Sequence, residues 1–369
     1  MKLRHAIFAL SVCLVASAFA GRAPADDEII WSVTTTKKEM RTIGAIQSET
    51  PNEIVIKPSG ETAANVIPVG KIVDVVYQVP VLVRQEYRGA LNREAAAQRT
   101  AKQEERRREL ASALQRYREL LPKLSEERAK RHVEFKIAKL HALQSGNDPA
   151  ELPLALDHLS RFKNGHPQGW QLSACADLLA NLQLARQDWT AAQKTFEDLA
   201  ATSNLSAETR QACELKVARI QMRAGKYTQA QRKLSDLAKV VAPDSAQGLR
   251  LQIALAECRA AAGASDEAAR LLEHLIAKIA DPDLKAAAYN ALGDCHRDAK
   301  KPREALWDYL WVDVVYPQDP QEHARALYHL SRLFQSFKDE TRAKQFRDQL
   351  EKDPQFAGLE YQRRLMVEK

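Results

Sequence analysis

Small residues recur along the second part of the chain at a nearly constant interval, within an apolar pattern that has the period of a helix. Successive gaps within one set of six are 37, 38, 38, 37 and 38 residues, and a second set stands twelve positions earlier. This period predicts about six helical hairpins over residues 126–358, and so a mainly α fold of the α-solenoid type. The first set is Ala155, Ala192, Ala230, Ala268, Ala305 and Ala343, and the second is Ala180, Ala218, Ala256, Gly293 and Ser331.

The residues between the apolar runs favour tight turns from helix to helix. Gly225 and Gly263 suit the left-handed conformation that ends a helix, and Pro302 suits the first turn of the next one. Each unit is therefore expected to hold two antiparallel helices that approach closely through their small residues. Prolines close successive units, at Pro167, Pro243, Pro282, Pro317 and Pro354.

Residues 27–83 have a different pattern, in which short runs rich in Ile, Val and Thr alternate with turn signals such as Thr50-Pro51-Asn52. Five such runs predict five short strands in a small β-barrel-like module. The module resembles an SH3-like or Sm-like barrel in strand count and spacing. No peptide-binding set of aromatic residues marks it, so docking and a folded N-terminal cap both stay open as its role.

Residues 86–122 are rich in Glu and Arg on every side, which predicts one long, charged connecting helix that Pro122 ends. A coiled coil is the alternative, but large apolar residues are missing for at least two heptads after Leu91. Residues 359–369 follow the last unit as a C-terminal tail.

The first 20 residues have the three-part pattern of a secretory signal peptide. Lys2 and Arg4 precede an apolar run that is short for a membrane span, and small residues end it. Cleavage after Ala20, cleavage after Ala25 and retention as an anchor are the alternatives. The pattern predicts an exported protein of the periplasm or cell envelope, with no transmembrane helix in the mature chain.

The formal net charge of +7 falls to +5 without the two basic residues of this leader. Residues 84–139 carry 16 Lys and Arg against 9 Asp and Glu, but the two signs are interleaved. Nucleic-acid binding usually needs an unmixed basic patch, so this region indicates a solvated helix face and no nucleic-acid partner.

Candidate chemistry is thin, and its densest point is Asp294-Cys295-His296. Three consecutive helical side chains point about 100° apart and cannot converge on one metal or substrate atom. The common metal, nucleophile and phosphate-loop motifs are absent from the sequence, so we expect no catalytic site, metal or cofactor. Trp307 and Trp311 are expected to pack in the core or between repeats. The cysteines beyond the leader are expected as free buried thiols, at Cys175, Cys213, Cys258 and Cys295.

The unit that ends at Pro317 resembles the tetratricopeptide repeat. The positions that match the family pattern are Tyr289, Leu292, Gly293, Ala305, Tyr309 and Pro317. His296 and Val312 depart from it, and the other units keep the small residues and leucines but lose most aromatic residues. The period exceeds the family's of about 34 residues, which implies longer connections. The resemblance covers roughly residues 126–358, and a related helical-hairpin solenoid is the alternative name.

In that family the first helices line a concave groove that binds peptides or partner helices. The resemblance implies a partner-binding groove of mostly polar residues, with an ordinary solvated face as the alternative. The residues implied are Asp177, Asn181, Arg219, Met222, Arg223, Arg250, Glu257, Asn290, Asp294, Arg297, Asp298, Arg325, Tyr328, Arg332 and Gln335.

The sequence thus leads to one main functional hypothesis, a non-enzymatic scaffold of the cell envelope that binds a protein or peptide in the repeat groove. The second hypothesis is an envelope-attachment protein that acts through its β module and basic helix, with the repeats as a spacer. It would include a peripheral contact with membrane or cell wall. An enzyme with a site in the β module lacks a convergent set of acid, base or nucleophile.

Overall fold

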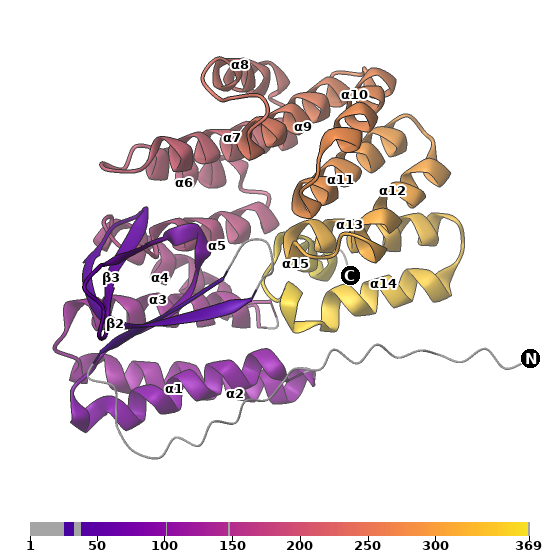
Figure 1. Ribbon diagram of the computed structural model, residues 1–369. Coiled ribbons are helices and arrows are strands. Elements are labelled where there is room, and N and C mark those ends of the chain that lie inside the picture. The colour runs from indigo at the N-terminus through magenta and orange to yellow at the C-terminus, as the bar shows by residue number, and fades with distance from the viewer. Residues whose placement is uncertain (1–25, 33–37, 101, 147, 368–369) are drawn as a thin grey trace, which may run out of the picture.

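The computed structural model describes residues 26–32, 38–100, 102–146 and 148–367. In this part of the chain a small antiparallel sheet comes first and helices make up most of the rest (Figure 1). The expected signal peptide, residues 1–20, lies outside the described residues.

The five expected strands are present and form one sheet in the order β4-β3-β2-β1-β5. All neighbouring strands are antiparallel, and a short 3₁₀ turn, η1 (Val69–Lys71), leads into the last strand. Alternate side chains point to the core, as Ile54 and Ile56 do in β3, because successive strand residues face opposite sides. The strands are β1 (Asp27–Ser32), β2 (Glu39–Glu49), β3 (Glu53–Pro58), β4 (Asn65–Pro68) and β5 (Ile72–Val76).

The central strand β2 bends at Gly44, where its pairing with β1 ends and its pairing with β3 begins. A Cβ atom at Gly44 would lie 2.0 Å from the carbonyl oxygen of Lys57, so only glycine permits this approach. A register shift between Ile46 and Ser48 adds to the bend, as bulges do.

The segment expected as a single connecting helix, residues 86–122, instead contains two antiparallel helices, α1 (Val81–Arg99) and α2 (Gln103–Leu120). Thr100 ends α1 in an extended conformation with φ −86° and ψ 117°. The two helices pack through Ala90, Ala97 and Ala113, which are at most 1% exposed. The polar pattern hid this hairpin because the large buried residues of the two helices are few among many charged ones, and small alanines complete the contact.

Six antiparallel helix pairs follow, which confirms the predicted α-solenoid. The first helices of consecutive pairs contact one another along the inner side. At the contact within the fifth pair, a Cβ atom on Gly293 would lie 2.7 Å from the Tyr309 ring, so the small residue sets the spacing of the helices. The pairs are α3 (Glu127–Gln144) with α4 (Glu151–Gly165), α5 (Leu172–Ala185) with α6 (Trp189–Ala200), α7 (Ala207–Arg223) with α8 (Tyr227–Ala238), α9 (Ala246–Ala261) with α10 (Ser265–Lys278), α11 (Pro282–Asp298) with α12 (Pro302–Val314), and α13 (Pro320–Ser336) with α14 (Glu340–Lys352).

The expected C-terminal tail, residues 359–369, is instead an ordered helix over most of its length. After the 3₁₀ turn η3 (Pro354–Phe356), α15 (Glu360–Val367) lies inside the curve of the solenoid and contacts α5 and α13 (Figure 1). Buried Arg363 donates hydrogen bonds to the Ala142 carbonyl and, at 2.8 Å, to Ser145 Oγ. The last helix therefore ties the end of the solenoid back to its first hairpin.

The sheet shares one apolar core with α1, α2 and α3, and a group of buried and partly buried polar side chains crosses this junction. Lys136 of α3, only 3% exposed, lies 2.7 Å from Asp74 Oδ2 and 2.9 Å from Glu94 Oε2. His132 lies 3.1 Å from Asp74, and Lys139 lies 3.1 Å from Glu94. We call these five residues the junction network; they tie the sheet to the repeats from within.

The electrostatics of the junction network keep its ion pairs charged. Burial alone would lower the pKa of Lys136, but Asp74 and Glu94 outweigh burial and raise it. Burial alone would raise the pKa of Glu94, but Lys136 and Lys139 lower it to about 2. The ion pairs therefore persist through the neutral pH range.

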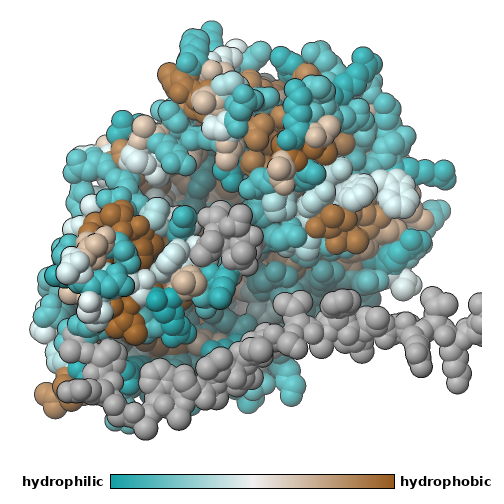
Figure 2. All heavy atoms as spheres, in the orientation of Figure 1, coloured by the Kyte–Doolittle hydropathy of each residue, from teal (hydrophilic) through white to brown (hydrophobic). Residues whose placement is uncertain are grey.

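Trp307 and Trp311 lie on the outer surface, 67% and 45% exposed, which corrects the expectation that they pack in the core or between repeats. Trp311 stacks on the Tyr289 ring with 5.7 Å between centroids. A spacing of four residues puts both rings on one side of α12, but it does not say whether that side is covered. Figure 2 shows a mostly hydrophilic face with scattered hydrophobic areas. No described helix is long and apolar enough to cross a membrane.

Candidate functional site

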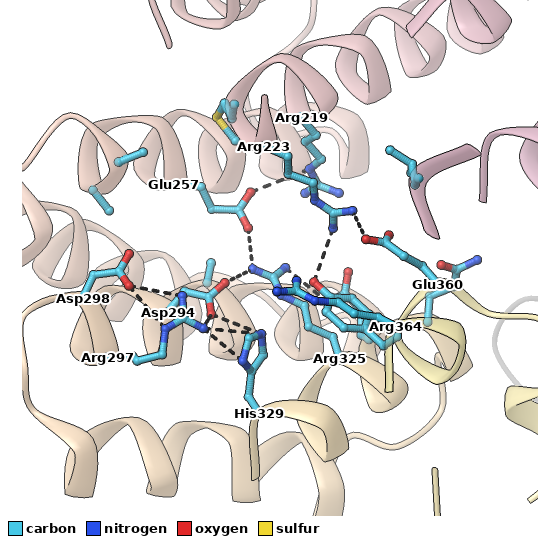
Figure 3. Close-up of a pocket in the computed structure, with 18 of the residues that line it drawn as sticks. Arg219, Arg223, Glu257, Asp294, Arg297, Asp298, Arg325, His329, Glu360 and Arg364 are labelled. Carbon is cyan, nitrogen blue, oxygen red and sulfur yellow. Dashed lines mark hydrogen bonds and ion pairs between the residues drawn. The ribbon is translucent and has the colours of Figure 1, made fainter. Parts of the chain in front are cut away.

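The inner side of the solenoid encloses a hollow of about 490 Å³ (Figure 3). The first helices of four consecutive pairs, α7, α9, α11 and α13, contribute to its walls, and so do the turn between α5 and α6 and the helix α15. Eight of the fifteen residues implied for the groove line this hollow, which we call the inner pocket. They are Arg219, Met222, Arg223, Glu257, Asp294, Arg297, Asp298 and Arg325.

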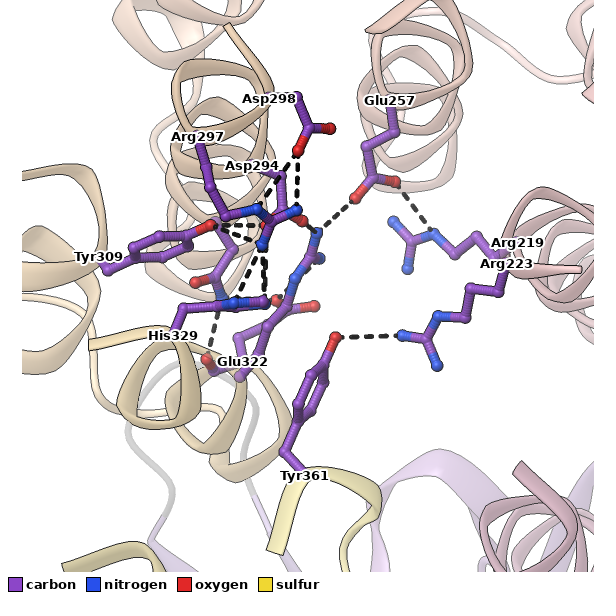
Figure 4. A network of polar contacts seen from close by, with 12 residues as sticks. Arg219, Arg223, Glu257, Asp294, Arg297, Asp298, Tyr309, Glu322, His329 and Tyr361 are labelled. Carbon is purple, nitrogen blue, oxygen red and sulfur yellow. Dashed lines mark hydrogen bonds and ion pairs between the residues drawn. The ribbon is translucent and has the colours of Figure 1, made fainter. Parts of the chain in front are cut away.

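Asp294 is the centre of a polar network in the inner pocket (Figure 4). Its Oδ1 accepts hydrogen bonds from Arg297 at 2.7 Å and from the Tyr309 hydroxyl at 2.6 Å. Its Oδ2 pairs with Arg325, which also donates to Glu257 at 2.9 Å. His329 completes the set, since Arg297 Nη1 lies 3.0 Å from its Nδ1. Asp294, Arg297, Arg325, Glu257 and His329 form the pocket network.

The electrostatics of this network fix the charge of its members. Burial alone would raise the pKa of Asp294, but Arg325, His329 and Arg297 outweigh burial and hold it well below its usual range. Burial lowers the pKa of His329 to about 3, although Asp294 acts in the opposite direction. Asp294 is therefore an anion and His329 a neutral ring at pH 7.

The opposite wall of the inner pocket carries two arginines of α7. Arg223 pairs with Glu360 of α15, and it donates a hydrogen bond of 3.3 Å to the Tyr361 hydroxyl. Arg219 Nε lies 3.7 Å from Glu257 and makes no hydrogen bond with the described residues. Of the arginines that line the inner pocket, Arg219 thus has one of the weakest sets of acidic and hydrogen-bonding partners.

Seven implied groove residues lie outside the inner pocket. Asp177 pairs with Lys216, and buried Asn290 donates to Glu322 at 2.8 Å. Tyr328 is buried, and its ring lies 5.0 Å from the Arg364 guanidinium. The other four are partly or fully exposed: Asn181, Arg250, Arg332 and Gln335.

Sequence reasoning missed several residues that line the inner pocket, and those of α15 matter most. Glu360, Tyr361 and Arg364 reach the pocket from the segment that was expected to be a tail. Leu359 and Met366 stand seven residues apart, a helical spacing that could have marked this segment. Others missed are Gln187, Trp189, Tyr227, Glu322 and His329.

The consecutive residues Asp294, Cys295 and His296 point in three directions, as expected. Asp294 faces the inner pocket, Cys295 is 1% exposed in the core, and His296 Nδ1 lies 2.6 Å from Asp308 of α12. The four described cysteines are free and buried, and burial raises the pKa of the Cys295 thiol to about 12. Within the described residues, no group of three His, Cys, Asp or Glu side chains is arranged to hold a metal ion.

No protein-family model matches the chain, and neither does any curated protein. Several solved structures are similar in fold. A tetratricopeptide repeat protein from Parabacteroides merdae is 15% identical over 76% of this chain and 99% of that one, with a TM-score of 0.46. NprR in complex with its cognate peptide NprX is 13% identical over 72% and 77%, with a TM-score of 0.39.

A third similar structure is the tetratricopeptide repeat domain of P58(IPK), which is 15% identical over 78% of this chain and 81% of that one, with a TM-score of 0.24. Such values describe a shared general plan of stacked helical hairpins. The assignment of this chain to that class rests on its own six helix pairs, which form an α-solenoid consistent with degenerate tetratricopeptide repeats.

Proposed function

We propose that the protein is a non-enzymatic interaction scaffold that binds a peptide or protein segment in the inner pocket. One observation carries this proposal: equivalent positions of four successive repeats converge on one hollow with charged walls. An ordinary solvated helix face, the alternative, would not require charged residues of four repeats to meet at one hollow. Concave surfaces of stacked repeats suit extended or helical partner segments.

The charge of the pocket walls narrows the chemistry of the partner. Asp294, Arg297 and Arg325 largely satisfy one another, whereas Arg219 keeps unused donors beside the hollow. A guanidinium group binds carboxylates with good geometry. The partner segment is therefore one that presents a carboxylate toward α7.

The proposed setting is the periplasm or cell envelope, and the support for it is the leader-like sequence of the first 20 residues. Attachment through the β module, with the repeats as a spacer, is less well supported by the fold. The junction network joins the sheet to α3 through buried ion pairs, and the two regions share one core. A sheet that is fused to the repeats in this way orients them and is not a separate arm.

The proposal is tested with Arg219→Glu and with Arg250→Glu as its matched control. Both residues lie on first helices and both were implied for the groove, but only Arg219 lines the inner pocket. We expect Arg219→Glu to weaken partner binding at least about tenfold, the equivalent of about 1.4 kcal/mol, because a like charge then faces the partner carboxylate. The Arg250 variant should bind as the native protein does.

A photo-cross-linker at Met222, in the pocket, and another at Gln335, outside it, provide the readout in native envelope extracts. Mass spectrometry should find one protein attached through Met222, and Arg219→Glu should abolish that attachment. Equal yields from both positions, or an unchanged yield in the Arg219 variant, would contradict the proposal.

A further inference from the structure

A second hollow, of about 690 Å³, lies where the α1–α2 hairpin meets α3 and the turn η3. One side of its lining is apolar, with Ala97, Leu110, Leu143 and Pro354. The basic residues that face it include Arg106 and Lys139. Its size is within the range of small-molecule sites, and we call it the seam pocket because chain segments about 250 residues apart meet there.

Arg106 is the unusual residue of the seam pocket. It is only 4% exposed, and its Nη1 has no hydrogen-bond partner among the described residues. Burial lowers the pKa of Arg106, and the charge of Asp353 opposes that effect. A guanidinium group nevertheless stays protonated, so its buried charge is costly unless an anion pairs with it.

The acidic residues of the lining are already engaged with other partners. Glu94 binds Lys136 and Lys139 and accepts a hydrogen bond of 3.0 Å from the Tyr117 hydroxyl. Asp353 accepts hydrogen bonds from the backbone and side-chain nitrogens of Gln355, at 3.0 and 2.9 Å. Arg106 is therefore left with an uncompensated donor in the wall of the seam pocket.

We propose that the seam pocket binds a small monocarboxylate with an apolar chain or ring. Its carboxylate pairs with Arg106, and its apolar part lies against Leu110, Leu143 and Pro354. A single negative charge fits better than a dianion such as phosphate, because the lining holds three basic residues, Arg99, Arg106 and Lys139, against the two acidic residues Glu94 and Asp353, and so has a net charge of +1. This site is separate from the inner pocket, and the proposal does not depend on a partner being bound there.

The experiment is calorimetric titration of the full chain with octanoate at pH 7, with octanol and inorganic phosphate as comparison ligands. The variant is Arg106→Gln. Its matched control is Arg107→Gln, since Arg107 is the adjacent residue, 49% exposed and 4.0 Å from Asp148. We expect octanoate to bind the native protein with one-to-one stoichiometry. Octanol and phosphate should each bind at least about tenfold more weakly, the equivalent of about one lost charge-assisted hydrogen bond.

Arg106→Gln should weaken octanoate binding at least about tenfold, and Arg107→Gln should leave it unchanged. Without ligand, Arg106→Gln should melt at or above the native temperature, because it removes an unpaired buried charge. If that variant does not fold, Ala357→Trp fills the pocket from the η3 side and should abolish octanoate binding. No octanoate binding to the native protein, equal binding by a folded Arg106 variant, or tighter binding of phosphate would each overturn the proposal.

Discussion

The junction network and the pocket network contain the same kinds of side chain, yet they differ in what surrounds them. In the junction network, Lys136 is 3% exposed and sits between two carboxylates inside the core that the sheet shares with the helices. The central residue of the pocket network, Asp294, is 22% exposed beside the inner pocket, and Arg219, outside the network on the facing wall, is 31% exposed. The first arrangement is centred on a cation that protein encloses, although Glu94 and Lys139 at its edge also line the seam pocket. The second arrangement is centred on an anion that borders the inner pocket and has one side open to a ligand.

The difference shows that a cluster of buried charges does not by itself mark a functional site. A closed cluster whose groups satisfy one another fixes the position of two structural parts. A cluster that borders a hollow, with the under-used donor Arg219 on the facing wall, can gain a further partner. Stability measurements can separate the two, because only the closed cluster should be indispensable for folding.

The largest expected effect is that of Lys136→Met. Removal of this charge leaves partly buried Asp74 without its main partner and buried Glu94 with fewer partners, and breaking a buried pair costs about 3–5 kcal/mol. Urea unfolding measures the loss, and Lys130→Met, which breaks a surface pair with Glu127, is the control that should change little. A loss below about 1 kcal/mol for Lys136→Met would mean that the junction network is not the closed structure described here.

An intermediate effect is expected in the pH dependence that His329 contributes. The pKa of His329 is about 3 in the folded protein and about 6.5 when unfolded, so the unfolded chain binds more protons between these values. The stability that His329 contributes is therefore present above pH 6.5 and falls as the pH is lowered toward 3. Between pH 7 and pH 5 the unfolding free energy should fall by about 2 kcal/mol.

His329→Gln should therefore flatten the stability profile between pH 7 and pH 5, relative to the native protein. His274→Gln, on the outer face of α10, is the control and should keep the native profile. Parallel stability profiles for the native protein and His329→Gln would contradict this expectation. They would mean that water in the inner pocket reaches His329 and keeps its pKa near the unfolded value.

The smallest expected effect is that of Arg219→Ala. The side chain is 31% exposed and its only ion pair with the described residues spans 3.7 Å, so its removal should change the unfolding free energy by less than about 1 kcal/mol. Thermal and urea unfolding measure this change. A large destabilisation would show that Arg219 is held for the fold, and it would weaken the assignment of Arg219 to partner binding.

The repeats could be predicted from the sequence because their signal is local and repeated. The small residues of both sets are at most 3% exposed or, as at Gly293, lie against a side chain of the paired helix, here Tyr309. Equivalent positions in a solenoid also face the same side. For this reason the sequence alone could predict eight residues, from several repeats, that the structure brings together in one pocket.

What escaped prediction depends on contacts that are distant in the sequence. The helix α15 docks because Arg363 reaches Ala142, and nothing in the local pattern of residues 359–369 encodes that partner. The break between α1 and α2 falls in a stretch of charged residues with no Gly or Pro to mark it, and it is defined by packing between the two helices and the sheet. The exposure of Trp307 depends on whether another element covers α12, which periodicity does not report.

Arg363 of α15 donates a hydrogen bond to the carbonyl of Ala142 in α3, 221 positions earlier, and we call this contact the clasp. It has a consequence for how the molecule unfolds. An ordinary solenoid is a one-dimensional array in which an end repeat can fray while the others stay folded. Here the two ends hold each other, so fraying at either end must first break the clasp. Contacts of such sequence separation also form slowly. During folding, the repeats should therefore stack on one another first. The contact between Arg363 and Ala142, which joins the two ends, should form in a late, separate step.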